Sequence, residues 1–210
     1  MKLGVIGSGN IGMGIGSWAA KVGYDVTFSA KNEAGAKSAA QAAGHSAKAA
    51  NVRGAVEAAG LVLLAVPYGA VKEVLTDIRP LFRGKTVIDA TNPLSADFSS
   101  LTLGFTTSAA EEIAKLVPDA HVVKAFNTVF AQVYTSQNPK IQGKAISVFV
   151  ARDNKVATEK VQTLITKMGF DVVNAGPLKS ARNLEPLAML NISLGYGQGL
   201  GTSIGFTLLR

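Results

Sequence analysis

The sequence predicts an α/β fold with a doubly wound, mainly parallel sheet, and three observations support it. Short apolar runs alternate with helical stretches along the 210 residues, and no internal repeat or low-complexity linker interrupts them. One of these runs, residues 61–66, is continuously apolar, as expected of a parallel strand buried on both faces. A glycine-rich turn follows the first run directly. Together these features are typical of a nucleotide-binding sheet.

The first thirty residues contain a dinucleotide fingerprint. The strand-like run Lys2–Ile6 leads into residues 7–12, which read G-x-G-x-x-G, then into an apolar helical stretch and a second strand at 24–28. This order is that of a Rossmann fold. We expect Gly7 to permit the tight turn, Gly9 to let the backbone approach a pyrophosphate, and Gly12 to let the helix lie close to the sheet. The alternative is a glycine-rich helix start that binds nothing.

The end of the second strand indicates which dinucleotide binds. About twenty residues past the glycines, NAD sites usually place an acid that holds the ribose 2′-hydroxyl. Here that window holds Ser29, Ala30, Lys31 and Asn32, and Glu33 is better placed to start the next helix. A hydroxyl and an ammonium suit a 2′-phosphate, so NADP is favoured. The alternative for Lys31 is a solvated surface lysine.

Composition excludes several other classes. Hydrophobic residues make up 48% and charged residues 17%, which describes a globular chain with an ample core. Without cysteine and with two isolated histidines, we expect no metal site and no cysteine nucleophile. The start lacks a signal peptide's pattern, so we expect a cytoplasmic protein. The net charge of +7 is spread along the chain, which argues against nucleic acid and fits anionic small molecules better.

The remaining elements follow in order. Residues 33–43 are rich in Ala and Lys and predict a helix, 44–50 have weak strand character at best, and 52–59 predict a short helix. Ser108 and Glu111 form a capping box for a helix that runs to about Val117. The other expected strands are 61–66, 85–89, 121–125, 145–151 and 170–173, and the other expected helices are 70–78 and 154–168.

Three of these strands end in polar or proline-containing turns. The turns contain Val66-Pro67, Asn92-Pro93 and Phe126-Asn127-Thr128. Ligands of doubly wound sheets lie beyond the carboxyl ends of the strands, so we expect these turns to face the cofactor crevice. Asn92 offers an amide near the nicotinamide, although an ordinary Asn-Pro turn explains it nearly as well.

Five sequence blocks together match a known family. They are GSGNIG at 7–12, AVPY at 65–68, ATNPL at 90–94, VKAFNT at 123–128 and GPLKSARNLE at 176–185. With these motifs the chain resembles the NADPH-dependent reductases of the deazaflavin coenzyme (factor 420). The wider group of these reductases includes the cytoplasmic NADPH-binding domain of membrane ferric reductases.

The resemblance implies a Rossmann domain at 1–174 and a small carboxyl-terminal helical lobe at 175–210 for substrate binding and dimerisation. It also implies NADP(H) as cofactor, with the hydride acceptor near Asn127 and the last helix. Ala30 stands where these reductases tend to have serine, and Lys31 where they have arginine. The AFNT segment looks more like the ferric-reductase branch. The expected cofactor-binding residues are Gly7, Ser8, Gly9, Asn10, Ile11, Gly12, Ser29, Ala30, Lys31, Asn32, Ala65, Val66, Pro67, Tyr68, Val71, Asn92, Pro93, Ala125 and Asn127.

Hydride transfer to a deazaflavin or flavin ring requires stacked rings and no obligatory catalytic acid or base. The candidates for orienting such an acceptor are Asn127, Arg182 and Glu185. For the last two, the alternative is an ion pair between positions i and i+3 of one helix. A hydroxy-acid dehydrogenase would require a catalytic base, and neither histidine lies in a recognised motif.

The stretch 186–209 contains no charged residue, which is long enough to suggest a membrane span. Its five glycines and several polar side chains favour instead a buried helix in a homodimer interface, with Gly197, Gly201 and Gly205 at small-xxx-small spacing. The sequence thus predicts an NADPH-dependent oxidoreductase that acts on a deazaflavin, a flavin, a quinone or, indirectly, ferric iron. The alternative is a non-catalytic NADP-binding module that senses redox state or regulates a partner.

Overall fold

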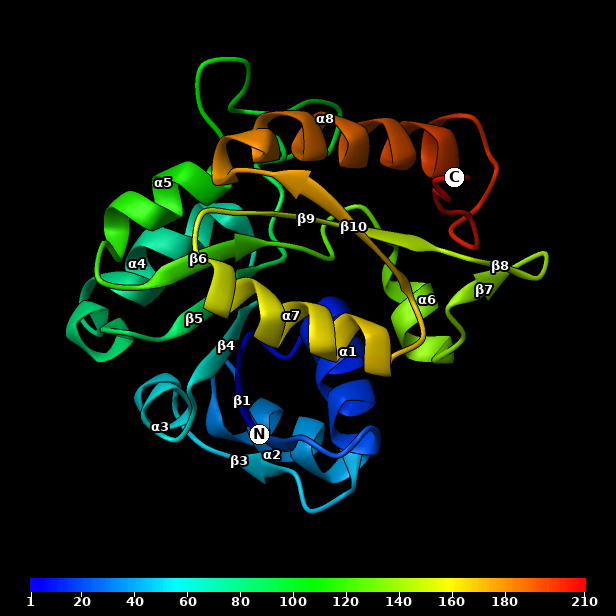
Figure 1. Ribbon diagram of the computed structural model, residues 1–210. Coiled ribbons are helices and arrows are strands. Elements are labelled where there is room, and N and C mark those ends of the chain that lie inside the picture. Colours follow the sequence, from blue (N-terminus) through cyan, green and yellow to red (C-terminus); the bar gives the residue numbers. More distant parts are fainter.

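The computed structural model describes all residues, 1–210, and is built on one eight-stranded sheet (Figure 1). The strands lie in the order β10-β9-β6-β5-β4-β1-β2-β3, and a separate hairpin pairs β7 with β8. The strands of the sheet are β1 Lys2–Ile6, β2 Asp25–Ser29, β3 Lys48–Ala49, β4 Leu61–Leu64, β5 Thr86–Asp89, β6 His121–Lys124, β9 Ser147–Arg152 and β10 Asp171–Gly176, and the hairpin is β7 Lys140–Ile141 and β8 Lys144–Ala145.

Eight α-helices connect these strands or follow them. They are α1 Asn10–Lys21, α2 Glu33–Ala43, α3 Val52–Glu57, α4 Val71–Thr76, α5 Ala109–Leu116, α6 Ala131–Ser136, α7 Lys155–Lys167 and α8 Ala181–Ile192. Single turns of 3₁₀-helix lie at Tyr68–Ala70, Arg79–Phe82 and Leu178–Ser180, and a π-helical turn at Ser193–Gly197 continues α8.

The sheet confirms the predicted fold class and refines it at one edge. Strands β3, β2, β1, β4, β5 and β6 are all parallel, in the order of a Rossmann sheet. Strand β9 is antiparallel to β6, and β10 is parallel to β9. After β6 the chain stays at the carboxyl edge, in α6 and the hairpin, so it re-enters the sheet from that edge. Neither α6 nor the hairpin was predicted from the sequence.

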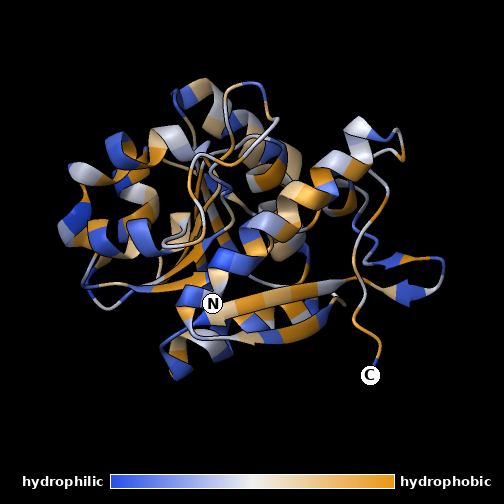
Figure 2. Ribbon diagram, turned by 90° about the horizontal axis from the view of Figure 1, so that it is seen from above, coloured by the Kyte–Doolittle hydropathy of each residue, from blue (hydrophilic) through white to orange (hydrophobic).

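Alternating side chains of the strands divide the core into two layers. In β4, Leu61 and Leu63 pack in the cluster that contains residues of α1, α2 and α7, while Val62 and Leu64 pack in the cluster beneath α3, α4 and α5. Burial on both faces explains why residues 61–64 are continuously apolar. Figure 2 shows apolar residues along the strands and hydrophilic residues on the outer sides of the surrounding helices.

Side-chain caps explain where several helices begin. Asn32, Asn51, Ser108 and Asn154 each accept a hydrogen bond from a backbone amide in the first turn of α2, α3, α5 and α7. The predicted helix at 33–43 coincides with α2. Helix α1 differs, because its N-cap is Gly9 and no side chain caps its first amides. Those amides are therefore left for another acceptor.

The carboxyl-terminal region departs from the expected buried helix. Helical structure ends with the π turn at Gly197, so Gly197, Gly201 and Gly205 do not share one helix face. The chain then runs back beside β9, where the Ser147 amide donates to the Phe206 carbonyl at 2.8 Å. None of the helices has the length and apolar character needed to cross a bilayer. The domain boundary expected after residue 174 falls inside β10, and a separate carboxyl-terminal lobe stays a prediction.

Candidate functional site

The turn after β1 has the geometry that its glycines predict. Gly7 has a φ of 97°, a value that favours glycine, and a Cβ there would lie 2.5 Å from the Ala65 carbonyl oxygen. A Cβ on Gly12 would lie 1.8 Å from the Gly7 carbonyl oxygen, so α1 packs closely against the turn. Around Gly9 a Cβ would meet nothing within 4 Å. The backbone at Gly9 is thus open to an incoming group.

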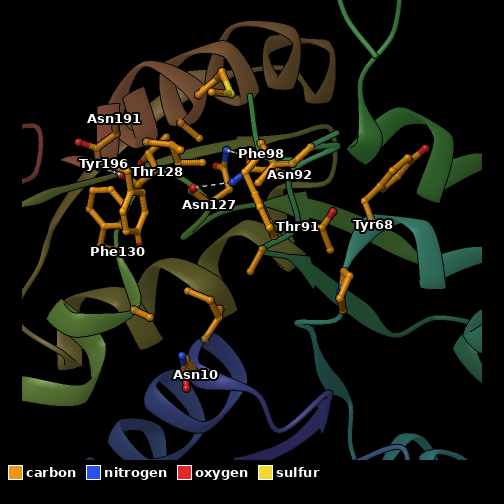
Figure 3. Close-up of a pocket in the computed structure, with 18 of the residues that line it drawn as sticks. Asn10, Tyr68, Thr91, Asn92, Phe98, Asn127, Thr128, Phe130, Asn191 and Tyr196 are labelled. Atoms are coloured by element: carbon orange, nitrogen blue, oxygen red, sulfur yellow. Dashed lines mark hydrogen bonds between the residues drawn. The ribbon is translucent and has the colours of Figure 1, made fainter. Parts of the chain in front are cut away.

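A cavity of ≈ 1180 Å³ lies beyond the carboxyl ends of β1, β4, β5 and β6 (Figure 3). Residues of α8 and the π turn form another of its sides. The predicted turns share this pocket, because it is lined by residues 9–11, 65–69, 90–92 and 126–132, together with 94–99, 188–189, 191–193 and 196–198. Single ligand sites usually measure about 300–1,000 Å³, so the pocket has room for more than one ring system.

Several expected cofactor-binding residues do not line this pocket. Val71 and Ala125 are 1% and 0% exposed and belong to the two core layers, since their side chains point into the sheet–helix interfaces. Pro93 is buried as well and is not among the residues that line the pocket. The other expected residues outside the lining lie in the two turns that follow β1 and β2, namely Gly7, Ser8, Gly12, Ser29, Ala30, Lys31 and Asn32.

In the turn after β2, fewer side chains are available to bind a phosphate than the sequence suggests. The Ser29 hydroxyl is buried and donates to the Val5 carbonyl at 2.8 Å, so it is engaged within the sheet and not free for a phosphate. Asn32 accepts from the Gly35 amide at 2.8 Å as the cap of α2. Lys31 is exposed, and no hydrogen bond or ion pair engages its ammonium. Lys31 is therefore the cation of this turn that a ligand can reach.

Two asparagines form a reciprocal pair in the pocket wall (Figure 3). Asn92 Nδ2 donates to the Asn127 carbonyl oxygen, and Asn127 Nδ2 donates to Asn92 Oδ1, both at 2.9 Å. Asn127 Nδ2 also donates to the Leu184 carbonyl of α8 at 3.0 Å. The pair thus joins the ends of β5 and β6 to the last helix. Both ends of the Asn92 amide are therefore engaged within the protein.

A buried charge network lies behind this pair. Lys124 Nζ lies 2.9 Å from Asp89 Oδ2 and 2.9 Å from Glu185 Oε1, and it donates to the Thr91 carbonyl at 2.6 Å. Glu185 also accepts from the amides of Ala109 and Ala110 at the start of α5. Burial raises the pKa of the Glu185 carboxyl, and the Lys124 ammonium opposes that shift.

Arg182 and Glu185 form ion pairs with residues of other elements and lie outside the pocket. Arg182 donates to Glu111 through Nε at 2.9 Å and Nη2 at 2.7 Å, and neither Arg182 nor Glu185 lines the cavity. The alternative of an ion pair between these two residues is wrong as well, because each pairs with a different partner. Of the three candidates for orienting an acceptor, only Asn127 lies in the pocket.

The pocket is nearly free of charge. Asp97 is the only ionisable Asp, Glu, His, Lys or Arg side chain in its lining. Hydrogen bonds from Ser95 and then Ser99 lower the pKa of Asp97 to about 2, so it is an anion at neutral pH. Burial raises the pKa of the Tyr68 hydroxyl, which keeps the phenol protonated. No group of three or more potential ligands gathers anywhere to hold a metal ion.

Sequence reasoning missed much of this lining. Phe98 comes from the loop after β5, Phe130 from the turn after β6, and Tyr196 from the π turn. The rings of Phe130 and Tyr196 meet edge to face, with centroids 5.7 Å apart. Phe98 and Phe130 are 32 positions apart and Phe130 and Tyr196 are 66 apart, in stretches without clear periodicity, so no local pattern could have indicated that all three share one pocket.

Comparison with known proteins agrees with this geometry. Residues 2–93 match the family described as NADP oxidoreductase, coenzyme F420-dependent. The F420-dependent NADP reductase of Methanothermobacter marburgensis is 28% identical, over 92% of this chain and 92% of that protein. The human metalloreductase STEAP2 is 28% identical over 94% of this chain, which spans only 38% of that protein's length.

A solved structure is similar over the whole chain. The crystal structure of a putative F420-dependent NADP-reductase from Arthrobacter sp. FB24 matches with a TM-score of 0.90 and 26% identity, and the match covers 100% of both chains. These similarities confirm the resemblance that the five sequence blocks predicted. The chain is thus similar to the F420-dependent NADP reductases and to the amino-acid sequences of the metalloreductases.

Proposed function

We propose that this relative of the F420-dependent NADP reductases is an NADP-dependent oxidoreductase. It transfers a hydride between NADP(H) and a flat redox acceptor such as a deazaflavin or a flavin. One observation carries the proposal: a single large pocket runs from the uncapped start of α1 to α8 and contains only one charged side chain. Such a pocket accommodates two flat ring systems face to face.

The residues around the first turn fit NADP(H). The amides that open α1 have no side-chain cap, and the backbone at Gly9 is open, so a pyrophosphate fits against the positive end of the helix. Lys31 supplies the cation for a 2′-phosphate. When bound, the nicotinamide supplies or accepts the hydride. The protein's part is to hold the ring beside the turns after β4, β5 and β6 and to exclude water.

The lining of the pocket favours an acceptor that needs no proton from the protein. It offers amides, hydroxyls and aromatic rings, but no histidine, lysine or arginine. Tyr68 is a protonated phenol in this lining, but burial raises its pKa and makes it a weaker proton donor. Asp97 is held ionised by Ser95 and Ser99, so it is a poor general acid. Reduction of a carbonyl or an imine usually uses a positioned acid, whereas a flavin or deazaflavin ring spreads the incoming charge over its own atoms.

The test follows NADPH oxidation in parallel with deazaflavin, FMN, a quinone and ferric chelates. We expect turnover with at least one tricyclic ring acceptor. Tight NADPH binding without turnover on any acceptor would contradict the oxidoreductase and favour a non-catalytic NADP-binding module. NADH matching NADPH in both affinity and rate would contradict the role of Lys31 but not the hydride transfer.

We also propose that two copies of the chain associate through the end of α8. Leu190, Tyr196 and Leu200 are 51%, 66% and 59% exposed, which leaves apolar side chains uncovered on one end of the molecule. A second copy that packs there would also shield the adjoining pocket wall. Sedimentation at micromolar concentration should show a dimer, and Leu190→Glu should weaken it. A monomer under these conditions excludes the interface.

A further inference from the structure

Asn127 carries a buried hydrogen-bond acceptor that nothing in the protein satisfies. The residue is 7% exposed and lines the pocket at the end of β6. Its Nδ2 donates to Asn92 Oδ1 and to the Leu184 carbonyl. Both partners are acceptors, so the network fixes which end of the amide is nitrogen. The remaining atom, Oδ1, is buried and has no hydrogen-bond partner.

The position of this atom separates it from the other unpaired buried groups. The Tyr24 hydroxyl and Thr86 Oγ1 also lack partners, but neither residue lines the pocket. A buried acceptor without a donor carries a desolvation penalty, which a ligand removes if it brings a donor to that place. Asn127 is in addition held rigidly, since β5, β6 and α8 all meet its amide or its backbone.

We propose that Asn127 Oδ1 accepts a hydrogen bond from an amide or imide N–H at the edge of a redox ring bound in the pocket. This inference rests on the proposed function and names the ligand chemistry that its pocket recognises. A neutral N–H donor suits this wall, because the carboxylates behind it, Asp89 and Glu185, are already paired with the Lys124 ammonium. Because Oδ1 is closed off from water, a neighbouring wall side chain must turn aside when the ring enters.

Two kinds of ring carry this chemistry, the nicotinamide and the flavin or deazaflavin ring, and the experiment separates them. The nicotinamide has a carboxamide N–H, and the isoalloxazine ring of a flavin has an imide N–H. In one arm, equilibrium dialysis compares NADP⁺ with its 3-acetylpyridine analogue, which keeps the carbonyl but lacks the N–H. In the other arm, fluorescence titration in the presence of NADP⁺ compares riboflavin with N3-methylriboflavin. Both comparisons are made on the wild-type protein, on Asn127→Ala and on Asn92→Ser.

We expect one analogue to bind the wild-type protein about tenfold more weakly than its parent. Asn127→Ala should reduce that ratio to near one. Asn92→Ser removes the partner of Nδ2 but leaves Asn127 Oδ1, so it should retain the ratio and thereby control for disturbance of the pair. If riboflavin does not bind, the nicotinamide arm decides alone.

Two results would overturn the inference. The first is that neither analogue binds the wild-type protein more weakly than its parent. The second is a ratio that persists unchanged in Asn127→Ala, which would assign the N–H to another acceptor. In both cases NADPH still binds and the proposed function stands. Failure of NADP⁺ itself to bind the wild-type protein would instead contradict the proposed function.

Discussion

The Lys124 ammonium lies 2.9 Å from the Glu185 carboxylate, and both side chains are almost completely buried. This ion pair connects α8 to the end of β6, directly behind the pocket wall that contains Asn127. Asp89 completes the network from β5, and the first amides of α5 complete it from the other side of Glu185. One buried cation between two carboxylates thus contributes to the placement of α8 over the carboxyl edge of the sheet, together with the Asn127–Leu184 hydrogen bond.

Lys124→Met should destabilise the protein by about 3–5 kcal/mol, because it leaves two carboxylates buried without their cation. Urea unfolding followed by circular dichroism measures this change. Lys37→Met serves as the matched control, since the Lys37–Glu33 pair is exposed on α2 and its loss should be barely detectable. Equal stability of Lys124→Met and the wild-type protein would show that the network contributes little.

Lys31→Asp should weaken NADPH binding by roughly ten- to hundredfold and spare or improve NADH binding, because it removes the one available ammonium after β2 and introduces a potential ribose ligand. Fluorescence titration of both cofactors gives the two affinities. Lys37→Asp, six residues further along and on α2, controls for the change in net charge. Equal losses for NADPH and NADH would show that Lys31 does not meet the 2′-phosphate.

Two glycines of the same turn should respond differently to alanine. Gly9→Ala places its Cβ in open space at a φ of −72°, so stability should be preserved while NADPH affinity falls. Gly12→Ala places its Cβ 1.8 Å from the Gly7 carbonyl oxygen, so the helix must shift and stability should fall. Thermal unfolding and NADPH titration of both variants separate the two effects. Full NADPH affinity in Gly9→Ala would argue against a pyrophosphate at this turn.

Acidification should loosen the contact between α8 and α5. The Arg182 guanidinium, together with the Ser108 hydroxyl, lowers the pKa of the Glu111 carboxyl from its ordinary 4.5. A lowered pKa in the folded state means that this contribution to stability is fully present above pH 4.5. It is lost as the pH falls through the folded-state value. Glu111→Gln should therefore show a shallower loss of stability below pH 4.5 than the wild-type protein, measured by thermal unfolding. Parallel pH profiles would exclude this pair as a source of the acid sensitivity.

Local sequence patterns predicted the elements that depend on local physics. The alternation of strands and helices, the capped start of α5 at Ser108, and the positive-φ turn at Gly7 all follow from propensity, capping and backbone sterics within a few residues. The carboxyl ends of parallel strands necessarily share one edge, so the sequence also predicted that the turns at Pro67, Asn92 and Asn127 would meet.

Other features depend on partners that are distant in the chain. Arg182 and Glu185 are three residues apart and of opposite charge, which suggests a helical pair, yet their partners are Glu111 and Lys124. Ser29 stands where a phosphate ligand is expected, but the register of β1 and β2 places its hydroxyl against the Val5 carbonyl. In each case the nearest partner belongs to another element.

The sequence by itself indicated the parallel part of the sheet and the dinucleotide turn, and it predicted a preference for a 2′-phosphate, because each depends on residues that are neighbours in the chain or at the ends of adjacent strands. Only the tertiary structure decided which polar groups remain available. It buried Glu185 against α5, closed Ser29 within the sheet, and left Asn127 Oδ1 unpaired beside an almost uncharged pocket. The physical reason is that hydrogen-bond satisfaction is a property of the whole packed molecule, since each donor and acceptor competes for partners brought together only by folding.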